Sequence, residues 1–84
     1  MNENLPETII YKGYQIKPSP RLVIVEGVEK WNTQFKIFEH KGSEVRELIF
    51  NGRVVFETKQ EAIKYCFQAG KDTIDKEPEK LIKH

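Results

Sequence analysis

The fold of this chain is decided by residues 58–74, which read TKQEAIKYCFQAGKDTI. Thr58, followed three residues later by Glu61, forms a capping box, in which the Thr hydroxyl accepts a hydrogen bond from the Glu61 backbone amide. Behind this cap, apolar residues recur at the spacing of a single helical stripe. The stripe consists of Ala62, Ile63, Cys66, Phe67, Gly70 and Ile74. We therefore predict one helix that begins after Thr58 and buries this stripe against the rest of the chain.

Two residues of the stripe carry further expectations. Gly70 costs about 1 kcal/mol of helix propensity relative to Ala, so its place on the stripe predicts a close approach of the helix backbone to a neighbouring element. Cys66 lies in the middle of the helix, away from the N-terminal dipole that would lower the pKa of a thiol. It is therefore interpreted as a core residue rather than a reactive thiol.

The residues that precede the helix are typical of short β-strands. Two β-prone runs, at residues 8–11 and 14–17, flank Lys12-Gly13, which is interpreted either as a tight turn or as a bulge within one bent strand. Residues 21–25 form a β-prone run in which four aliphatic residues follow Arg21. Residues 31–40 alternate apolar and polar side chains, as one long strand with a single buried face does.

The dipeptide Asn51-Gly52 is the strongest short hairpin signal in the chain, because a type I′ turn needs positive φ at both central residues. Such a turn would pair residues 44–50 with residues 53–57. Leu48 would then lie opposite Val55, and Phe50 opposite Arg53, on one face of the sheet. Because Ile49, Val54 and Phe56 would occupy the other face, the sequence leaves open which face meets the helix.

Together these features predict an α+β domain, with an antiparallel meander sheet of four to five strands and one C-terminal helix packed on one face. The domain is expected to span residues 8–76, with flexible termini at residues 1–7 and 77–84. The 84 residues provide material for one core and are too few for two.

The composition also excludes several classes of protein. The chain is 38% hydrophobic and 32% charged, with a formal net charge of +1. No window reaches the roughly 18 to 20 consecutive apolar residues of a membrane span, and the first residues lack the layout of a signal peptide. We therefore expect a cytoplasmic protein with no membrane partner.

No set of residues has the spacing of a catalytic or metal site. His40 and His84 are the only histidines, and neither has a nucleophile or acid at a spacing that implies catalysis. A structural zinc site would need further Cys or His residues near Cys66. The glycines are isolated and do not form a phosphate-binding loop. We therefore expect no enzymatic activity, no metal and no cofactor.

Three motifs resemble those of a group of short bacterial proteins of uncharacterised function. They are Tyr-x-Gly-Tyr-x-Ile-x-Pro-x-Pro at residues 11–20, an aromatic strand opened by Trp31, and Phe-x-Thr-x-x-Glu-Ala at residues 56–62. The resemblance covers about residues 10–75. It implies a sheet-plus-helix domain and carries no catalytic or binding residue with it.

The expected function is that of a non-catalytic protein-interaction module, which binds an unknown protein partner or a second copy of itself. One helix covers one sheet face, so an apolar set on the other face is a candidate contact surface. This candidate protein contact consists of Phe38, Leu48, Phe50 and Val55.

The alternative is weak nucleic-acid binding through the mildly basic sheet half. Residues 11–56 carry eight Lys and Arg against five Glu. The candidate nucleic-acid contacts are Trp31, Lys36, Arg46 and Arg53. The order of strands then helix also resembles a double-stranded RNA-binding domain, but this chain lacks the opening helix and the Lys cluster of that domain.

Overall fold

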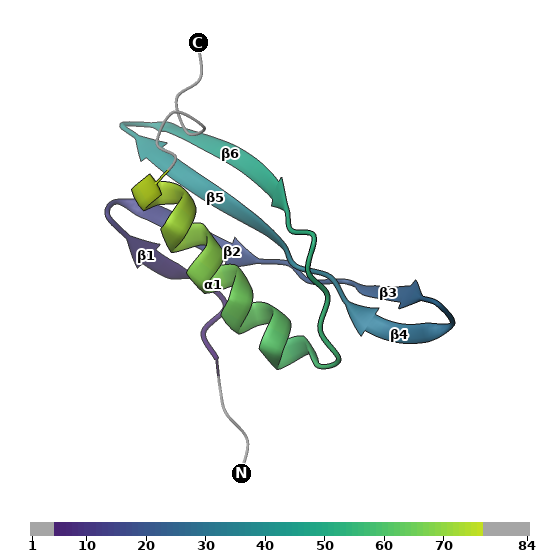
Figure 1. The fold of residues 1–84 in the computed structure, drawn as a ribbon. Coiled ribbons are helices and arrows are strands. Elements are labelled where there is room, and N and C mark those ends of the chain that lie inside the picture. Colours follow the sequence, from purple (N-terminus) through teal and green to yellow (C-terminus); the bar gives the residue numbers. More distant parts are fainter. Residues whose placement is uncertain (1–4, 77–84) are drawn as a thin grey trace.

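The computed structural model describes residues 5–76, which form six antiparallel strands and a C-terminal helix, an α+β fold as the sequence predicts (Figure 1). Of the termini expected to be flexible, residues 1–4 and 77–84 lie outside the described residues. The elements are β1 (Ile9–Tyr11), β2 (Tyr14–Pro18), β3 (Leu22–Val25), β4 (Val28–Trp31), β5 (Gln34–Lys41), β6 (Glu44–Asn51) and α1 (Lys59–Lys76).

The strands form two separate sheets. β1, β2, β5 and β6 are hydrogen-bonded in that order, as a meander interrupted between its second and third strands. The interruption is the hairpin of β3 and β4, which pair only with each other. Figure 1 shows α1 lying across one face of the larger sheet, while the hairpin projects beyond it. We call residues 22–31 the arm, and β1, β2, β5, β6 and α1 the body.

Each of the three hairpins has a two-residue turn between its strands. Lys12 and Gly13 have φ values of 52° and 86°, so this dipeptide is a type I′ turn and not a bulge. Glu26 and Gly27, at 51° and 78°, make the same turn at the tip of the arm. Between β5 and β6 the positive φ of Gly42, 59°, identifies a type II′ turn.

The core lies between α1 and the face of the larger sheet where Ile16, Ile37 and Leu48 stand side by side on three neighbouring strands. Ile16 and Ile37 are fully buried, as is Cys66 on the helix, so the predicted core position of Cys66 is confirmed. A Cβ atom added to Gly70 would lie 2.7 Å from Cγ2 of Ile16. The predicted close approach of the helix backbone is therefore also confirmed.

The helix begins where the capping box places it. The Glu61 backbone amide donates to Oγ1 of Thr58 over 3.2 Å, and the Thr58 hydroxyl donates to Oε1 of Glu61 over 2.9 Å. The first helical bond runs from the Ala62 amide to the Thr58 carbonyl oxygen. Thr58 is thus the N-cap, which satisfies one of the amides that a helix start leaves without an intrahelical partner.

The predicted Asn51-Gly52 hairpin is wrong. β6 ends at Asn51, and the Gly52 amide donates to the carbonyl oxygen of Thr33 over 3.0 Å. A Cβ atom on Gly52 would overlap the Thr33 hydroxyl, which itself donates to the carbonyl oxygen of Val54. Glycine is needed here for close packing and not for a turn, and its φ is not positive. Leu48 consequently pairs with Ile37 and not with Val55.

The predicted single strand over residues 31–40 is also wrong, because it is two strands in two sheets. β4 ends at Trp31 and β5 begins at Gln34. Between them, Asn32 bonds Arg21 twice: its amide donates to the Arg21 carbonyl oxygen, and its Oδ1 accepts from the Arg21 amide. These bonds close the base of the arm. The buried Thr33, Phe35 and Ile37 nevertheless share one face, as the alternation predicts.

Candidate functional site

The predicted contact set does not form one surface. Leu48 is buried beneath α1, and Phe50 stacks on Phe35 on the same face with ring centroids 5.3 Å apart. Phe38 lies on the opposite, open face, and Val55 lies beyond the sheet. The expectation that Leu48 and Phe50 face away from the helix is therefore wrong, because their orientation is set by pairing with β5 and not by a turn at Asn51-Gly52.

The open face of the larger sheet carries scattered apolar side chains. Ile10 and Ile49 are 70% and 54% exposed, and Phe38 is half-buried between Gln15 and Glu47 on the neighbouring strands. Next to Ile49, the Lys36 ammonium bonds the Glu47 carboxylate over 3.1 Å. Polar groups thus separate the apolar residues of this face. The sequence left open which face Ile49 occupies, and the structure places it on the open face, away from α1.

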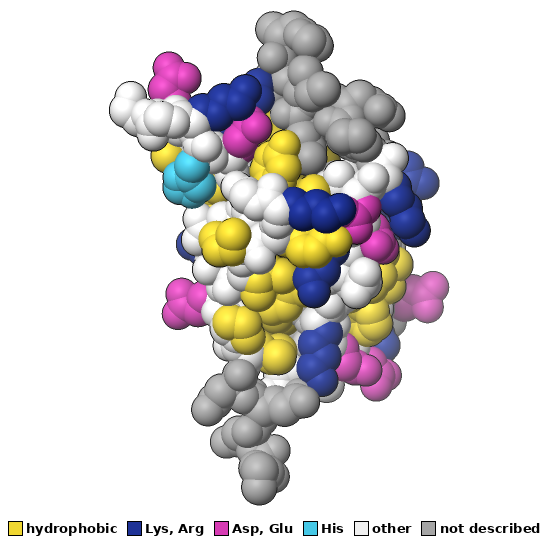
Figure 2. Space-filling model, turned by 90° about the vertical axis from the view of Figure 1, so that its left-hand side faces the viewer, with side chains coloured by type: hydrophobic (Ala, Val, Ile, Leu, Met, Phe, Trp, Pro, Cys, Tyr) yellow, Lys and Arg dark blue, Asp and Glu magenta, His cyan; other side chains and the backbone are white. Residues whose placement is uncertain are grey.

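The four candidate nucleic-acid contacts are not brought together on one element, and Arg53 follows the end of β6. Lys36 is on the open sheet face, whereas Arg46 is on the helix face, where it bonds the Glu39 carboxylate over 2.9 Å. Trp31 closes β4, and the Lys59 ammonium lies 5.7 Å from its ring centroid. Figure 2 shows the side of the molecule that lies to the left in Figure 1, where Lys and Arg side chains are mixed with acidic and hydrophobic ones. The described residues do not form a continuous basic stripe on that side.

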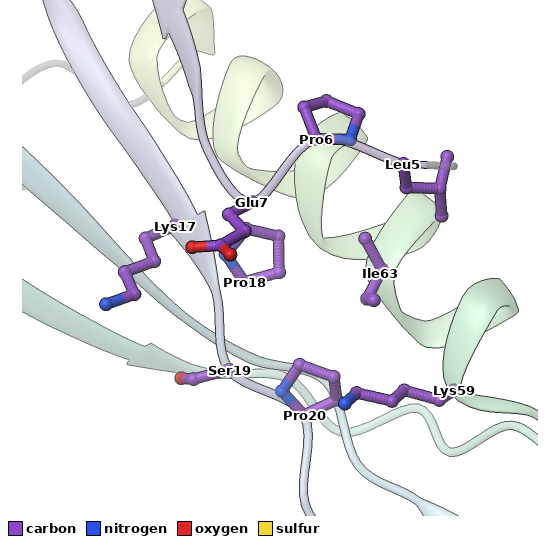
Figure 3. A pocket seen from close by; sticks show the side chains of 9 residues that line it. All are labelled: Leu5, Pro6, Glu7, Lys17, Pro18, Ser19, Pro20, Lys59 and Ile63. Atoms are coloured by element: carbon purple, nitrogen blue, oxygen red, sulfur yellow. The ribbon is translucent and has the colours of Figure 1, made fainter.

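A cleft of about 350 Å³ lies beside the first turn of α1 (Figure 3). Its apolar wall is built by Leu5, Pro6, Pro18, Pro20 and Ile63. The charged side chains at it are Glu7, Lys17 and Lys59. Small-molecule sites place several polar groups so that they converge on the ligand. In Figure 3 the Lys17 amine extends away from the helix, and the Lys59 side chain extends toward Pro20 at the far end of the cleft, so the two amines do not converge.

A polar cluster joins the first hairpin to the end of the helix. Asp75 accepts hydrogen bonds from the Tyr11 hydroxyl and the Lys12 ammonium, over 2.7 and 2.6 Å. The bond from Lys12 and then that from Tyr11 lower the pKa of the Asp75 carboxyl, and the same bonds raise the pKa of both partners. Lys12 and Asp75 are exposed, and Tyr11 is half-buried. The cluster therefore links the end of α1 to the first hairpin at the surface, where such pairs contribute little to stability.

The environment of the single thiol, that of Cys66, disfavours reactivity. Cys66 is fully buried, and its Sγ lies 3.5 Å from the carbonyl oxygen of Gln34. Burial raises the pKa of this thiol to about 11. Since the thiolate is the reactive form, Cys66 is not suited to nucleophilic chemistry. His40 is exposed, and its Nε2 lies 3.4 Å from Oε1 of Gln15.

The most unusual surface of the molecule is the arm. Leu22, Ile24 and Val28 are 49%, 65% and 52% exposed, and Val25 is also exposed. Leu22 and Ile24 share one face of this two-stranded ribbon with Trp31, while Val23, Val25 and Val28 share the other. An isolated two-stranded hairpin is only marginally stable in water, because neither face is covered. The sequence indicated the apolar strand but not its separation from the sheet.

No group of His, Cys, Asp or Glu residues that could hold a metal ion occurs within residues 5–76. In the same part of the chain, no helix has the length and apolar character needed to cross a membrane.

The sequence matches no protein-family model, no curated protein and no solved structure. The resemblance to short bacterial proteins therefore stays a prediction.

Proposed function

We propose that this chain is a non-catalytic protein-interaction module of the cytoplasm, and that it binds its partner through the β3–β4 arm. The observation that carries the proposal is the row of exposed aliphatic side chains on both faces of the arm. Clustered apolar surface of this kind is typical of protein contact sites, because burying it removes it from water.

The structure of the arm supports this choice over the open sheet face. On the sheet face, Ile10 and Ile49 are separated by charged and amide side chains. On the arm, the four residues of β3 are all aliphatic. The arm also projects from the body, so a partner can reach both of its faces (Figure 1). A cytoplasmic location agrees with a fold whose single cysteine is a buried free thiol.

Site-specific photocrosslinking in living cells tests the proposal. A photoreactive amino acid is placed at Ile24 on the arm and, in a second variant, at Ile49 on the open sheet face. These two residues are the same type and have comparable exposure, 65% and 54%. We expect a polypeptide adduct at position 24 and little or none at position 49.

Each other result contradicts the proposal in a defined way. Adducts at position 49 but not at position 24 would move the contact to the sheet face. A nucleic-acid adduct at position 24 in place of a polypeptide would favour the nucleic-acid alternative. The absence of any adduct at position 24 would mean that the arm contacts nothing.

A further inference from the structure

The two edges of the arm differ in chemistry. In antiparallel strands, successive residues turn their backbone groups alternately toward and away from the paired strand. Arg21 bonds Asn32 on the β4 side, so the amides and carbonyls of Leu22 and Ile24 point away from β4. Between Arg21 and Glu26, this outer edge of β3 carries no charged side chain, proline or bulge, the devices that normally prevent strands from pairing edge to edge.

The outer edge of β4 is protected. The Trp31 amide donates to the carbonyl oxygen of Phe56 over 2.7 Å, and the Trp31 carbonyl oxygen accepts from the Phe56 amide over 2.9 Å. Toward the tip, β4 carries Glu29 and Lys30. Antiparallel pairing of two β4 edges would bring either Glu29 or Lys30 opposite its own counterpart. Like charges directly opposite each other are destabilising, so of the two edges of the arm only that of β3 is suited to pairing.

We propose that the partner of the arm is a second copy of this chain, and that the two β3 edges pair antiparallel into a four-stranded sheet of order β4-β3-β3-β4. This inference rests on the proposed function. In the register that uses only strand residues, Leu22 lies opposite Ile24 of the second copy, and Val23 lies opposite its own counterpart. The backbone groups that point outward in each copy then bond each other.

The charges at the ends of β3 favour a second copy in this orientation. Arg21 precedes the strand and Glu26 follows it, so the edge is basic at one end and acidic at the other. In the antiparallel register, Arg21 of each copy comes within one position of Glu26 of the other, at both ends of the pairing. A parallel arrangement would place like charges together instead. Charge complementarity therefore sets the direction of pairing.

Pairing also removes the weakness of an isolated hairpin. Three or more strands are needed for a sheet to be stable by itself, and the dimer supplies four. Because the symmetry axis is perpendicular to the sheet, Leu22, Ile24 and Trp31 of both copies lie on one shared face. Val23, Val25 and Val28 of both copies lie on the other. Each aliphatic row thereby doubles in length.

Sedimentation equilibrium and light scattering on the purified chain measure the association. We expect wild type to shift from the mass of one copy to that of two as concentration rises. Arg21→Glu and Glu26→Lys should each weaken the dimer about tenfold, since each puts like charges together at both ends. The double variant Arg21→Glu/Glu26→Lys should restore association. Lys is compatible with this turn position, because Lys12 has nearly the same φ in the first hairpin, 52° against 51° for Glu26.

A proline variant tests the edge itself. Ile24→Pro removes an amide that points away from β4, so the arm keeps its internal hydrogen bonds but loses the bond to the second copy. We expect a folded monomer, with the thermal midpoint of monomeric wild type as the control. Glu44→Lys, which alters the flank of another hairpin, should leave the dimer unchanged.

Three results would overturn self-pairing: a wild type that keeps the mass of one copy at every concentration, a dimer unaffected by Ile24→Pro, or a double charge variant that fails to restore association. A monomeric wild type whose position 24 still crosslinks another polypeptide in cells would refute the second copy as partner. It would leave the proposed interaction function standing.

Discussion

The body and the arm use similar residues with opposite results. β2 (YQIKP) is the more polar strand, yet its Ile16 is fully buried, whereas Ile24 in the all-aliphatic β3 (LVIV) is 65% exposed. The two strands differ in whether a helix covers them. Ile16 faces α1 and contacts the backbone at Gly70, while the arm has no helix on either face (Figure 1). An apolar strand therefore becomes part of a core only where a second layer covers it.

Matched truncations give the largest expected contrast between the two regions. Ile16→Ala should lower the free energy of unfolding by about 2–5 kcal/mol, because it removes buried methyl groups and leaves a cavity. Ile24→Ala should change it by less than about 0.5 kcal/mol. Denaturant melts, at a concentration where light scattering gives the monomer mass, measure both values. Equal losses would mean that the arm belongs to the same cooperative unit as the body.

Thiol labelling contrasts the same regions by reaction rate. Burial and a pKa raised to about 11 should make native Cys66 react at least about a hundredfold more slowly with a thiol reagent than an exposed cysteine. The exposed reference is Ile24→Cys in a Cys66→Ala background. Denaturant should make the two rates equal. Rapid native labelling of Cys66 would contradict its burial.

The contact between Gly70 and Ile16 predicts an intermediate effect. Gly70→Ala improves helix propensity by about 1 kcal/mol, but its new methyl group meets Ile16 at 2.7 Å. We expect a net destabilisation of about 1–3 kcal/mol from overpacking. In an Ile16→Ala background the same substitution should become neutral or stabilising. A double-mutant cycle of denaturant melts checks this reversal, and additive effects would show that the contact is not tight.

The smallest predicted effect concerns a cap in the body and a turn in the arm. Thr58→Ala should lower the free energy of unfolding by about 1 kcal/mol, because it leaves the Glu61 amide without its acceptor. Thr58→Ser keeps the hydroxyl and should lower it less.

In the arm, Gly27→Ala strains a residue at φ 78°. It should nevertheless leave the midpoint of global unfolding unchanged if the arm melts separately. Thermal melts of the monomer compare them. A lowered midpoint for Gly27→Ala would couple the arm to the body.

Local chemistry made much of the body predictable from the sequence. The capping box located the start of α1, because both of its bonds lie within one turn. Helical spacing identified the stripe that contains the buried residues Cys66 and Gly70. Alternation identified the inward face of β5, and Lys12-Gly13 was recognised as a candidate turn. In each case the residues that decide the structure are neighbours in the sequence.

Contacts between distant residues decided the rest. Asn51-Gly52 has the local preference of a hairpin. Thr33 packs on Gly52 and donates a hydrogen bond to the carbonyl oxygen of Val54, so the chain runs past Thr33 and does not turn back on β6. Arg21 and Asn32 separate β4 from β5 in the same way, and this separation creates the arm. The sequence alone determined which residues form the helix and most of the strands. Only the tertiary structure decided which sheet face α1 covers and which apolar strand is left exposed, because burial depends on a second layer of distant residues.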